Sequence, residues 1–219
     1  MVKNEYLVER VENEEHRISV EIDPHCEDPR EWENLGTMLC GHKRYDLGDV
    51  QADGGYGSWE EELDVYLTEQ EWEDGVVLPL YLYDHSQLFM NTTGFSCSWD
   101  SGQVGWIYAN WQDIVNWYDL DPDLSYEYGG GEEINEYKDK ARKQLKNEVN
   151  LYDHYLRGEL YGFVVERKDN CGECGTTHYE LLDSCWGFIG SDGIGAILDT
   201  IREEFGDLDG LVDELADNL

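Results

Sequence analysis

The chain has 219 residues, of which 40% are hydrophobic and 13% aromatic. This composition can build a packed core and excludes the class of charged, aromatic-poor disordered chains. The net charge is −35, from 50 acidic against 15 basic residues. Such a chain repels nucleic acid and anionic lipid, so we expect no direct binding to either and favour basic protein surfaces or cations as partners.

The start of the chain lacks the apolar segment of a secretory signal, and no run approaches the roughly 20 apolar residues that cross a bilayer. We therefore expect a cytoplasmic protein with no membrane partner. Six cysteines in such a chain favour free thiols or a metal site over a disulfide framework.

The first predicted elements are two strands and a helix, identified from alternating and from helical spacing of apolar residues. Residues 5–12 and 16–23 alternate apolar and polar side chains, which predicts two strands of a hairpin with one buried face. Residues 58–75 predict one helix with Ser58 as N-cap and acidic residues in its first turn. Its apolar positions share one face: Trp59, Leu63, Tyr66 and Leu67.

The middle of the chain is richer in apolar runs. Residues 76–85 predict a strand, in which Pro79 removes one ladder hydrogen bond and favours an edge or a bulge. Residues 104–110 predict a second strand, and residues 111–118 a short helix before an acidic loop.

A long amphipathic helix over 132–157 is the clearest element, closed at Gly158. Its apolar positions recur at three- and four-residue steps: Ile134, Tyr137, Ala141, Leu145, Val149 (or Glu148), Tyr152 and Tyr155. Residues 160–167 and 178–190 predict two strands around a cysteine-containing loop.

One or two helices complete the chain from residue 191, the first capped by Ser191 or Asp192. Together these elements predict an α+β fold with a mostly antiparallel sheet. We predict a single domain over 1–219, with residues 190–219 either inside it or forming a small helical appendage.

The segment FSCSWDSGQVGWIY (95–108) contains the residue types of a nucleophile turn. A nucleophile elbow needs a helix after its serine, whereas Ser101 precedes a predicted strand. We therefore predict an ordinary turn at Asp100, Ser101 and Gly102. Trp99, Trp106 and Tyr108 should then pack on the sheet.

Asp84, His85 and Ser86 are the residue types of a hydrolytic triad. Adjacent strand residues point to opposite faces, so Asp84 cannot orient His85 locally. We predict a structural histidine here.

Two metal sites are candidates. Cys171 and Cys174 form a C-G-E-C-G knuckle, for which His178 and Cys185 are the nearest further zinc ligands. No second C-x-x-C follows, so a reduced hairpin tip and a redox pair stay open as alternatives. Asp119, Asp121 and Asp123 have the spacing of a calcium loop, but Leu124 and Gly130 stand where an EF-hand has Gly and Glu.

Three segments, NLGTMLCGHKRYDLGD, FSCSWDSGQVGWIY and DSCWGFIG, carry a resemblance. Together with LPLYLYDHS they resemble a family of acidic, uncharacterised proteins encoded by phages and other mobile elements, over roughly residues 5–190. The resemblance implies a host-cell setting and no particular reaction.

The acidity and this resemblance lead to one functional hypothesis. B-DNA presents one charge per about 1.7 Å of axis, and a folded carboxylate surface of similar spacing can occupy a basic groove. We predict a nucleic-acid mimic that inhibits a host nuclease, restriction enzyme or CRISPR effector. The expected partner-binding residues are Glu31, Glu33, Glu60, Glu61, Glu62, Asp64, Glu69, Glu71, Glu73, Asp74, Asp119, Asp121, Asp123 and Glu127.

Two other classes of function stay open. An acidic structural or accessory protein, salt-adapted or virion-associated, explains the charge without mimicry. A metal-dependent enzyme is a third hypothesis, with Asp100, His85 or Cys185 near its site. No P-loop, dinucleotide fingerprint or zinc-protease motif supports an enzyme, and we favour a protein without catalytic activity.

Overall fold

A computed structural model describes residues 6–52, 58–121 and 131–219. The chain forms two compact units, one of residues 1–27 and 158–219 and the other of residues 28–157. Both are α+β and mostly antiparallel, with a long helix in the second unit and C-terminal helices in the first, as the sequence predicts. The single domain over 1–219 stays a prediction.

The first unit is a four-stranded antiparallel sheet in the order β1-β2-β8-β9. Its strands are β1 (Leu7–Glu12), β2 (His16–Ile22), β8 (Leu160–Asn170) and β9 (Thr177–Ile189). The predicted N-terminal hairpin and the hairpin around the cysteine-containing loop are both confirmed. β9 is an edge strand, and Tyr179, Leu181 and Trp186 on it are exposed.

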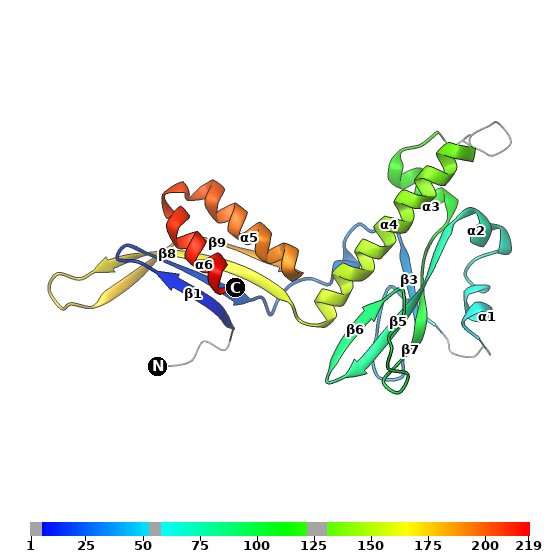
Figure 1. Cartoon of the computed structure of the whole chain (residues 1–219), viewed down its shortest axis with the longest axis horizontal. Coiled ribbons are helices and arrows are strands. Elements are labelled where there is room, and N and C mark those ends of the chain that lie inside the picture. The colour runs from blue at the N-terminus through cyan, green and yellow to red at the C-terminus, as the bar shows by residue number, and fades with distance from the viewer. Residues whose placement is uncertain (1–5, 53–57, 122–130) are drawn as a thin grey trace. The chain divides into compact units, whose positions relative to one another are not determined.

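Helices α5 (Gly190–Glu204) and α6 (Asp209–Asn218) cover one face of this sheet, joined by the 3-10 turn Gly206–Leu208 (Figure 1). Ile197, Ile201 and Val212 pack there against Ile18 and Phe163. Residues 190–219 therefore complete the core of this unit. The predicted caps of α5 are wrong, because the helix begins one residue earlier, at Gly190, and has no side-chain cap.

The second unit is a five-stranded sheet in the order β4-β3-β7-β5-β6. Its strands are β3 (Thr37–Cys40), β4 (Val50–Gln51), β5 (Val76–His85), β6 (Gln87–Asn91) and β7 (Ser101–Ala109). Only β3 and β4 are parallel. Pro79 lies where β5 has no partner on its β6 side, next to a register shift at Leu80/Tyr81, which fits the edge or bulge expected of it.

Two layers of helix cover the two faces of this sheet. β3 shows the division, since Met38 and Cys40 point to the layer of α4 (Gly131–Leu156) and Leu39 points to the layer of α1 (Trp59–Leu63) and α2 (Glu69–Asp74). The helix α3 (Trp111–Tyr118) and a 3-10 turn at Pro29–Glu31 complete the unit. On α4, Glu148 and Val149 are both buried, which settles the alternative that the spacing left open.

The single helix expected over residues 58–75 is wrong. Two short helices, α1 (Trp59–Leu63) and α2 (Glu69–Asp74), stand in its place. Ser58 caps α1 as predicted, and Thr68 begins α2 through a capping box with Glu71. A Thr-x-x-Glu box stabilises a new helix start, so it breaks the run of apolar positions at residue 68.

No helix in the described parts of the chain is long and apolar enough to cross a membrane. The longest helix, α4, is strongly charged on its outer side, where Lys140, Arg142 and Asp139 lie.

Gly105 allows β3 and β7 to approach closely. A Cβ atom at this position would lie 1.9 Å from the Leu39 carbonyl oxygen, which is backbone and cannot rotate away. We expect Gly105→Ala to lower the free energy of unfolding by about 1–3 kcal/mol or more, as overpacking does. Urea denaturation measures the change.

The matched control is Gly102→Ala on the same strand, where an added Cβ meets nothing within 4 Å. We expect Gly102→Ala to change stability by less than about 0.5 kcal/mol. Equal losses in the two variants would contradict the close approach of β3 and β7.

Candidate functional site

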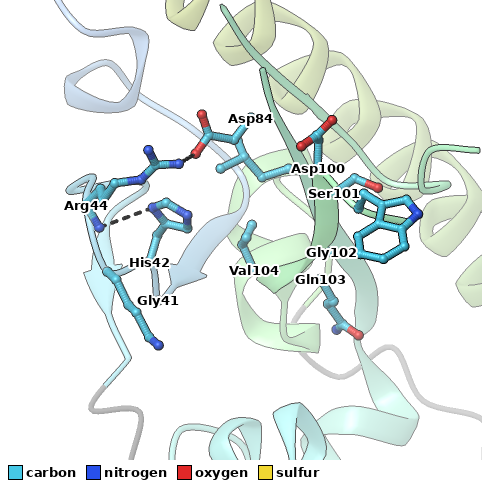
Figure 2. Close-up of a pocket in the computed structure, with 12 residues that line it drawn as sticks. Gly41, His42, Arg44, Asp84, Asp100, Ser101, Gly102, Gln103 and Val104 are labelled. Atoms are coloured by element: carbon cyan, nitrogen blue, oxygen red, sulfur yellow. Dashed lines mark hydrogen bonds and ion pairs between the residues drawn. The ribbon is translucent and has the colours of Figure 1, made fainter. Parts of the chain in front are cut away.

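Three features of the described chain offer chemistry: a polar pocket on the second sheet, the acidic helices α1 and α2, and the cysteine-containing hairpin tip of β8 and β9. The pocket has a volume of about 570 Å³. The loop after β3 forms one wall and the start of β7 forms the other (Figure 2). Leu82 and Val104 supply its apolar lining.

Opposite charges face each other across this pocket. Arg44 pairs with Asp84 across it (Figure 2). His85, which lies outside the lining, places Nδ1 3.4 Å from Asp100 Oδ2. Lys43 is exposed, and no carboxylate of the described residues pairs with its ammonium group.

The suspected nucleophile and triad are arranged differently from a hydrolase. Ser101 donates its hydroxyl hydrogen bond to the Cys97 carbonyl. Asp84 points to Arg44 instead of His85, as the alternation along a strand predicts. Both side chains are thus held by structural contacts, Ser101 by a backbone carbonyl and Asp84 by an ion pair with Arg44.

The turn in this segment is displaced from its predicted place. Ser101 and Gly102 already belong to β7, and the bend lies at residues 98–100. Trp106 and Tyr108 pack on the sheet as expected, but Trp99 is 95% exposed at the pocket rim. The expectation for Trp99 is wrong, because this residue lies in the bend before β7 and not in a strand.

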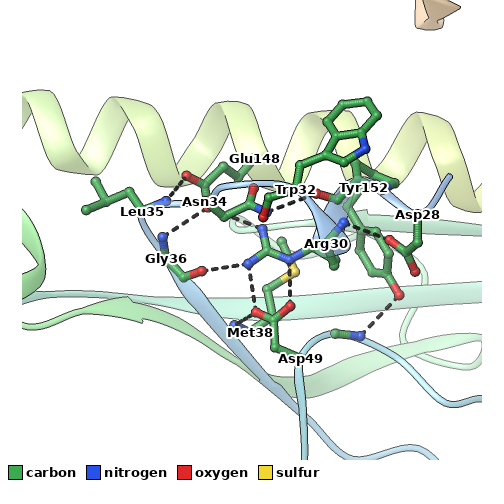
Figure 3. Close-up of polar contacts among 12 residues, drawn as sticks. Asp28, Arg30, Trp32, Asn34, Leu35, Gly36, Met38, Asp49, Glu148 and Tyr152 are labelled. Carbon is green, nitrogen blue, oxygen red and sulfur yellow. Dashed lines mark hydrogen bonds and ion pairs between the residues drawn. The ribbon is translucent and has the colours of Figure 1, made fainter. Parts of the chain in front are cut away.

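A buried ion-pair network holds the wall that carries residues 41–44. The Arg30 side chain is 5% exposed and donates to Asp49 at 2.7 Å and to Glu148 at 3.2 Å (Figure 3). Asp49 also accepts from the Met38 backbone N–H at 2.6 Å, which ties the network to β3.

The Glu148 carboxylate accepts hydrogen bonds from the backbone of the segment that precedes β3. Its two carboxylate oxygens accept from the backbone N–H groups of Leu35 at 2.9 Å and Gly36 at 3.1 Å (Figure 3). Gln144 donates a further bond at 3.1 Å. Burial alone would lower the pKa of Arg30, but the hydrogen bonds and charges of Asp49 and Glu148 outweigh it and the pKa is raised.

The expected partner-binding residues fall into three groups. Glu31, at the end of the 3-10 turn, and Glu33, two residues after it, are exposed, and the acids of α1 and α2 belong to the outer layer of the second unit. Asp119 and Asp121 are exposed at the end of α3, whereas Asp123 and Glu127 lie outside the described residues.

Not every acid of α1 and α2 faces solvent. Glu62 is 3% exposed, so the prediction that it belongs to the surface is wrong: the α1 face that carries it turns inward with Leu63. The carboxylate of Glu71 closes the capping box of α2. Glu60, Glu61, Asp64 and Glu73 are exposed, Asp74 is half-buried, and Glu69 lies at the start of α2.

The four candidate zinc ligands are not gathered in one place. Cys171 and Cys174 lie at the tip of the β8–β9 hairpin, and His178 is the second residue of β9. Cys185 lies seven residues further along β9, roughly 23 Å away at the rise of a strand. Among residues 6–52, 58–121 and 131–219, no group of three or more His, Cys, Asp or Glu side chains is arranged to hold a metal. A zinc or calcium ion stays a prediction.

Two of the cysteines differ sharply in acidity. Burial and the nearby Asp49 raise the pKa of the Cys40 thiol to about 12, which keeps it an inert core group. At the hairpin tip, the pKa of Cys174 is lowered to about 7, first by hydrogen bonds from the Thr176 side chain and backbone and then by Cys171. Thr176 Oγ1 lies 3.3 Å from Cys174 Sγ.

Replacing Arg30 tests the buried network. Arg30→Met leaves the Glu148 carboxylate, which is 4% exposed, without its cation, and we expect unfolding to become easier by about 3–5 kcal/mol. The control is Arg142→Ala, whose exposed i,i+3 pair with Asp139 contributes about 0.5 kcal/mol or less. Urea midpoints and slopes compare the two; similar small losses would contradict the network's role.

The acidity of Cys174 is tested by its alkylation rate as a function of pH. We expect the rate of carbamidomethylation at Cys174, followed by mass spectrometry, to rise with a midpoint near the pKa of about 7. Thr176→Val removes the hydroxyl hydrogen bond and should move the midpoint upward. Thr177→Val is the control, because the Thr177 hydroxyl bonds Asn170 Oδ1 instead; an unchanged midpoint in Thr176→Val would contradict the assignment.

Comparison of the chain with protein-family models, with curated proteins and with solved structures finds no match.

Proposed function

We propose that this chain is a binding protein that presents the acidic face of α1 and α2 to a basic groove on a partner protein. The partner class is a nucleic-acid-binding enzyme of a host cell, such as a nuclease, a restriction enzyme or a CRISPR effector. In that groove the carboxylates would take the place of backbone phosphates, as in a nucleic-acid mimic. The resemblance to acidic phage-encoded proteins supports this setting.

One observation carries the proposal: a hollow of about 660 Å³ on the outside of α1 and α2. Glu60, Asp64 and Glu73 line it together with the apolar side chains of Leu67 and Trp72. A lysine or arginine side chain suits such a hollow, because its methylene stem packs on apolar surface while its charged end reaches carboxylates. We name Glu60, Asp64 and Glu73 the acidic rim.

The acidic rim is short of compensating cations. Residues 45–137 contain 21 acidic residues and no lysine or arginine. Among the described residues, no basic side chain forms an ion pair with a carboxylate of the acidic rim; Lys138 Nζ instead bonds the backbone carbonyl of Glu73 at 2.9 Å. Uncompensated carboxylates around an apolar base favour a cationic partner over a neutral one.

The test compares two triple variants of equal charge. Glu60→Gln, Asp64→Asn and Glu73→Gln neutralise the acidic rim. Glu203→Gln, Asp207→Asn and Asp217→Asn neutralise three exposed acids of the first unit. Immobilised full-length chain captures proteins from bacterial lysate, and each captured nucleic-acid-binding protein is then assayed for duplex DNA binding by fluorescence polarisation.

We expect the wild type and the control triple to compete with DNA equally. The rim triple should compete about tenfold or more weakly, a loss of about 1.4 kcal/mol or more. Competition should weaken steeply between about 50 and about 300 mM salt. Equal loss in both triples would assign the effect to net charge alone. Capture without competition, or unfolding of the chain at low salt, would overturn mimicry and support an accessory role or salt adaptation.

A further inference from the structure

The tip of the β8–β9 hairpin carries two thiols within one turn, and nothing in the acidic-rim proposal uses them. The sequence there is Cys171-Gly-Glu-Cys174-Gly-Thr176. The ladder of β8 and β9 runs up to the pair Asn170 and Thr177, so the turn is anchored on both sides by paired backbone.

Backbone hydrogen bonds define the geometry of this turn. Gly175 N–H donates to the Cys171 carbonyl at 2.9 Å, and Cys171 N–H donates to the Thr176 carbonyl at 2.9 Å. The first bond closes one helix-like turn, in which residues three apart have Cα atoms about 5 Å apart. Disulfides join Cα atoms separated by about 4.4–6.8 Å, so the turn already holds Cys171 and Cys174 at a suitable separation.

The turn also has room to adjust. Gly175 has φ +69°, a left-handed conformation that glycine adopts at little cost. At Gly172 an added Cβ would meet no atom within 4 Å, so no neighbouring side chain fixes the backbone between the two thiols. Residues 172–176 are exposed, which gives a disulfide reagent direct access to Cys174.

Other thiols are poorly placed to compete. Cys40 is fully buried and Cys97 is half-buried, both in the second unit. Cys26 is half-buried at the end of the N-terminal segment of the first unit. Cys185, the remaining thiol of this hairpin, is paired in the ladder opposite Phe163, far along β9 from the tip. Among the described residues, no third metal-ligating side chain is gathered at the tip.

We propose that Cys171 and Cys174 form a dithiol–disulfide exchange site that reacts with aliphatic disulfides. The Cys174 thiolate attacks one sulfur of a disulfide RSSR, the S–S bond breaks, and RS⁻ leaves and takes up a proton as RSH. The Cys171 thiol then loses its proton and attacks the Cys174 sulfur of the mixed disulfide, releasing the second RS⁻, which is protonated in turn. Two electrons pass from the protein dithiol to RSSR, which becomes two RSH.

The experiment uses the full reduced chain with oxidised glutathione in the presence of EDTA. We expect the wild type to lose two hydrogens and to release two equivalents of reduced glutathione. Trypsin cleavage after Lys168 and Arg202 places Cys171, Cys174 and Cys185 on one peptide, so the partners are assigned with variants. Cys185→Ser should react like the wild type.

Cys171→Ser should stop at the mixed disulfide, with one glutathione bound to Cys174 and one equivalent released. Cys174→Ser should form no internal disulfide. A trivalent arsenical that bridges two thiols, phenylarsine oxide, gives an independent readout: its affinity should fall about tenfold or more in both variants and not in Cys185→Ser.

An internal disulfide that persists in Cys174→Ser would assign the chemistry to another thiol, and one that is lost in Cys185→Ser would assign it to Cys185; either result would overturn the proposal. The absence of any internal disulfide in the wild type would overturn it as well. Cys171 and Cys174 lie at the tip and Cys185 is exposed on β9, and circular dichroism verifies that each variant is folded. Failure of this exchange leaves the acidic-rim proposal untouched, because the two sites share no residue.

Discussion

The arrangement of the second unit depends on a guanidinium group that has been removed from water. Arg30 is 5% exposed, and the cost of that desolvation is offset only when every donor finds an acceptor. Asp49, Glu148 and the Gly36 carbonyl supply them. These acceptors come from three separate segments, so the network forms only when the segment before β3, the segment before β4 and the helix α4 stand in one particular arrangement. A shift of α4 by one turn would leave Glu148 buried without its partners.

The strand β3 connects this buried network to two surface features. The hydrogen bond from the Met38 backbone N–H to Asp49 fixes β3 in place. The polar pocket adjoins the end of β3, and the layer of α1 and α2 packs on one of its faces. The basic residues of the second unit are unevenly distributed over its elements. Five of the nine basic residues between 28 and 157 lie on α4, and two more lie in the loop at the pocket. Neither α1 nor α2 contains a lysine or arginine that could neutralise its carboxylates, although the unit as a whole contains nine basic residues.

Periodicity was sufficient to predict most of the helices, six of the nine strands in the described chain and the α+β class, because alternation and the 3.6-residue repeat record which side of an element is buried. The short strands β3, β4 and β6 were not predicted, since two to five residues are too few to establish an alternation. It failed where a local signal competes with a run of apolar residues, as at Thr68, where the capping box starts a second helix. It also placed Trp99 on the sheet and Glu62 on the surface, since a pattern gives the face of an element and not the path of a bend or the depth of a short helix. The pairing of Arg30 with Glu148, 118 positions apart, leaves no trace in either repeat. The acids of the rim could be listed from the sequence, but the hollow they line depends on how the fold places α1 and α2 side by side along it.

The short distance in sequence between the two tip cysteines determines how much a disulfide between them would change the stability of the fold. A bond between Cys171 and Cys174 would close a ring of four residues. By lowering the entropy of the unfolded chain, such a ring stabilises the fold by about 2 kcal/mol, against about 4.7 kcal/mol for a ring of 100 residues. The β8–β9 ladder below the tip is already complete in the thiol form. Oxidation and reduction would therefore alter the outline and reactivity of one exposed turn, and would change the stability of the fold by less than half of what a disulfide around a ring of 100 residues changes. A partner that binds the tip would respond mainly to the presence of the disulfide bond, because the β8–β9 ladder is already formed without that bond.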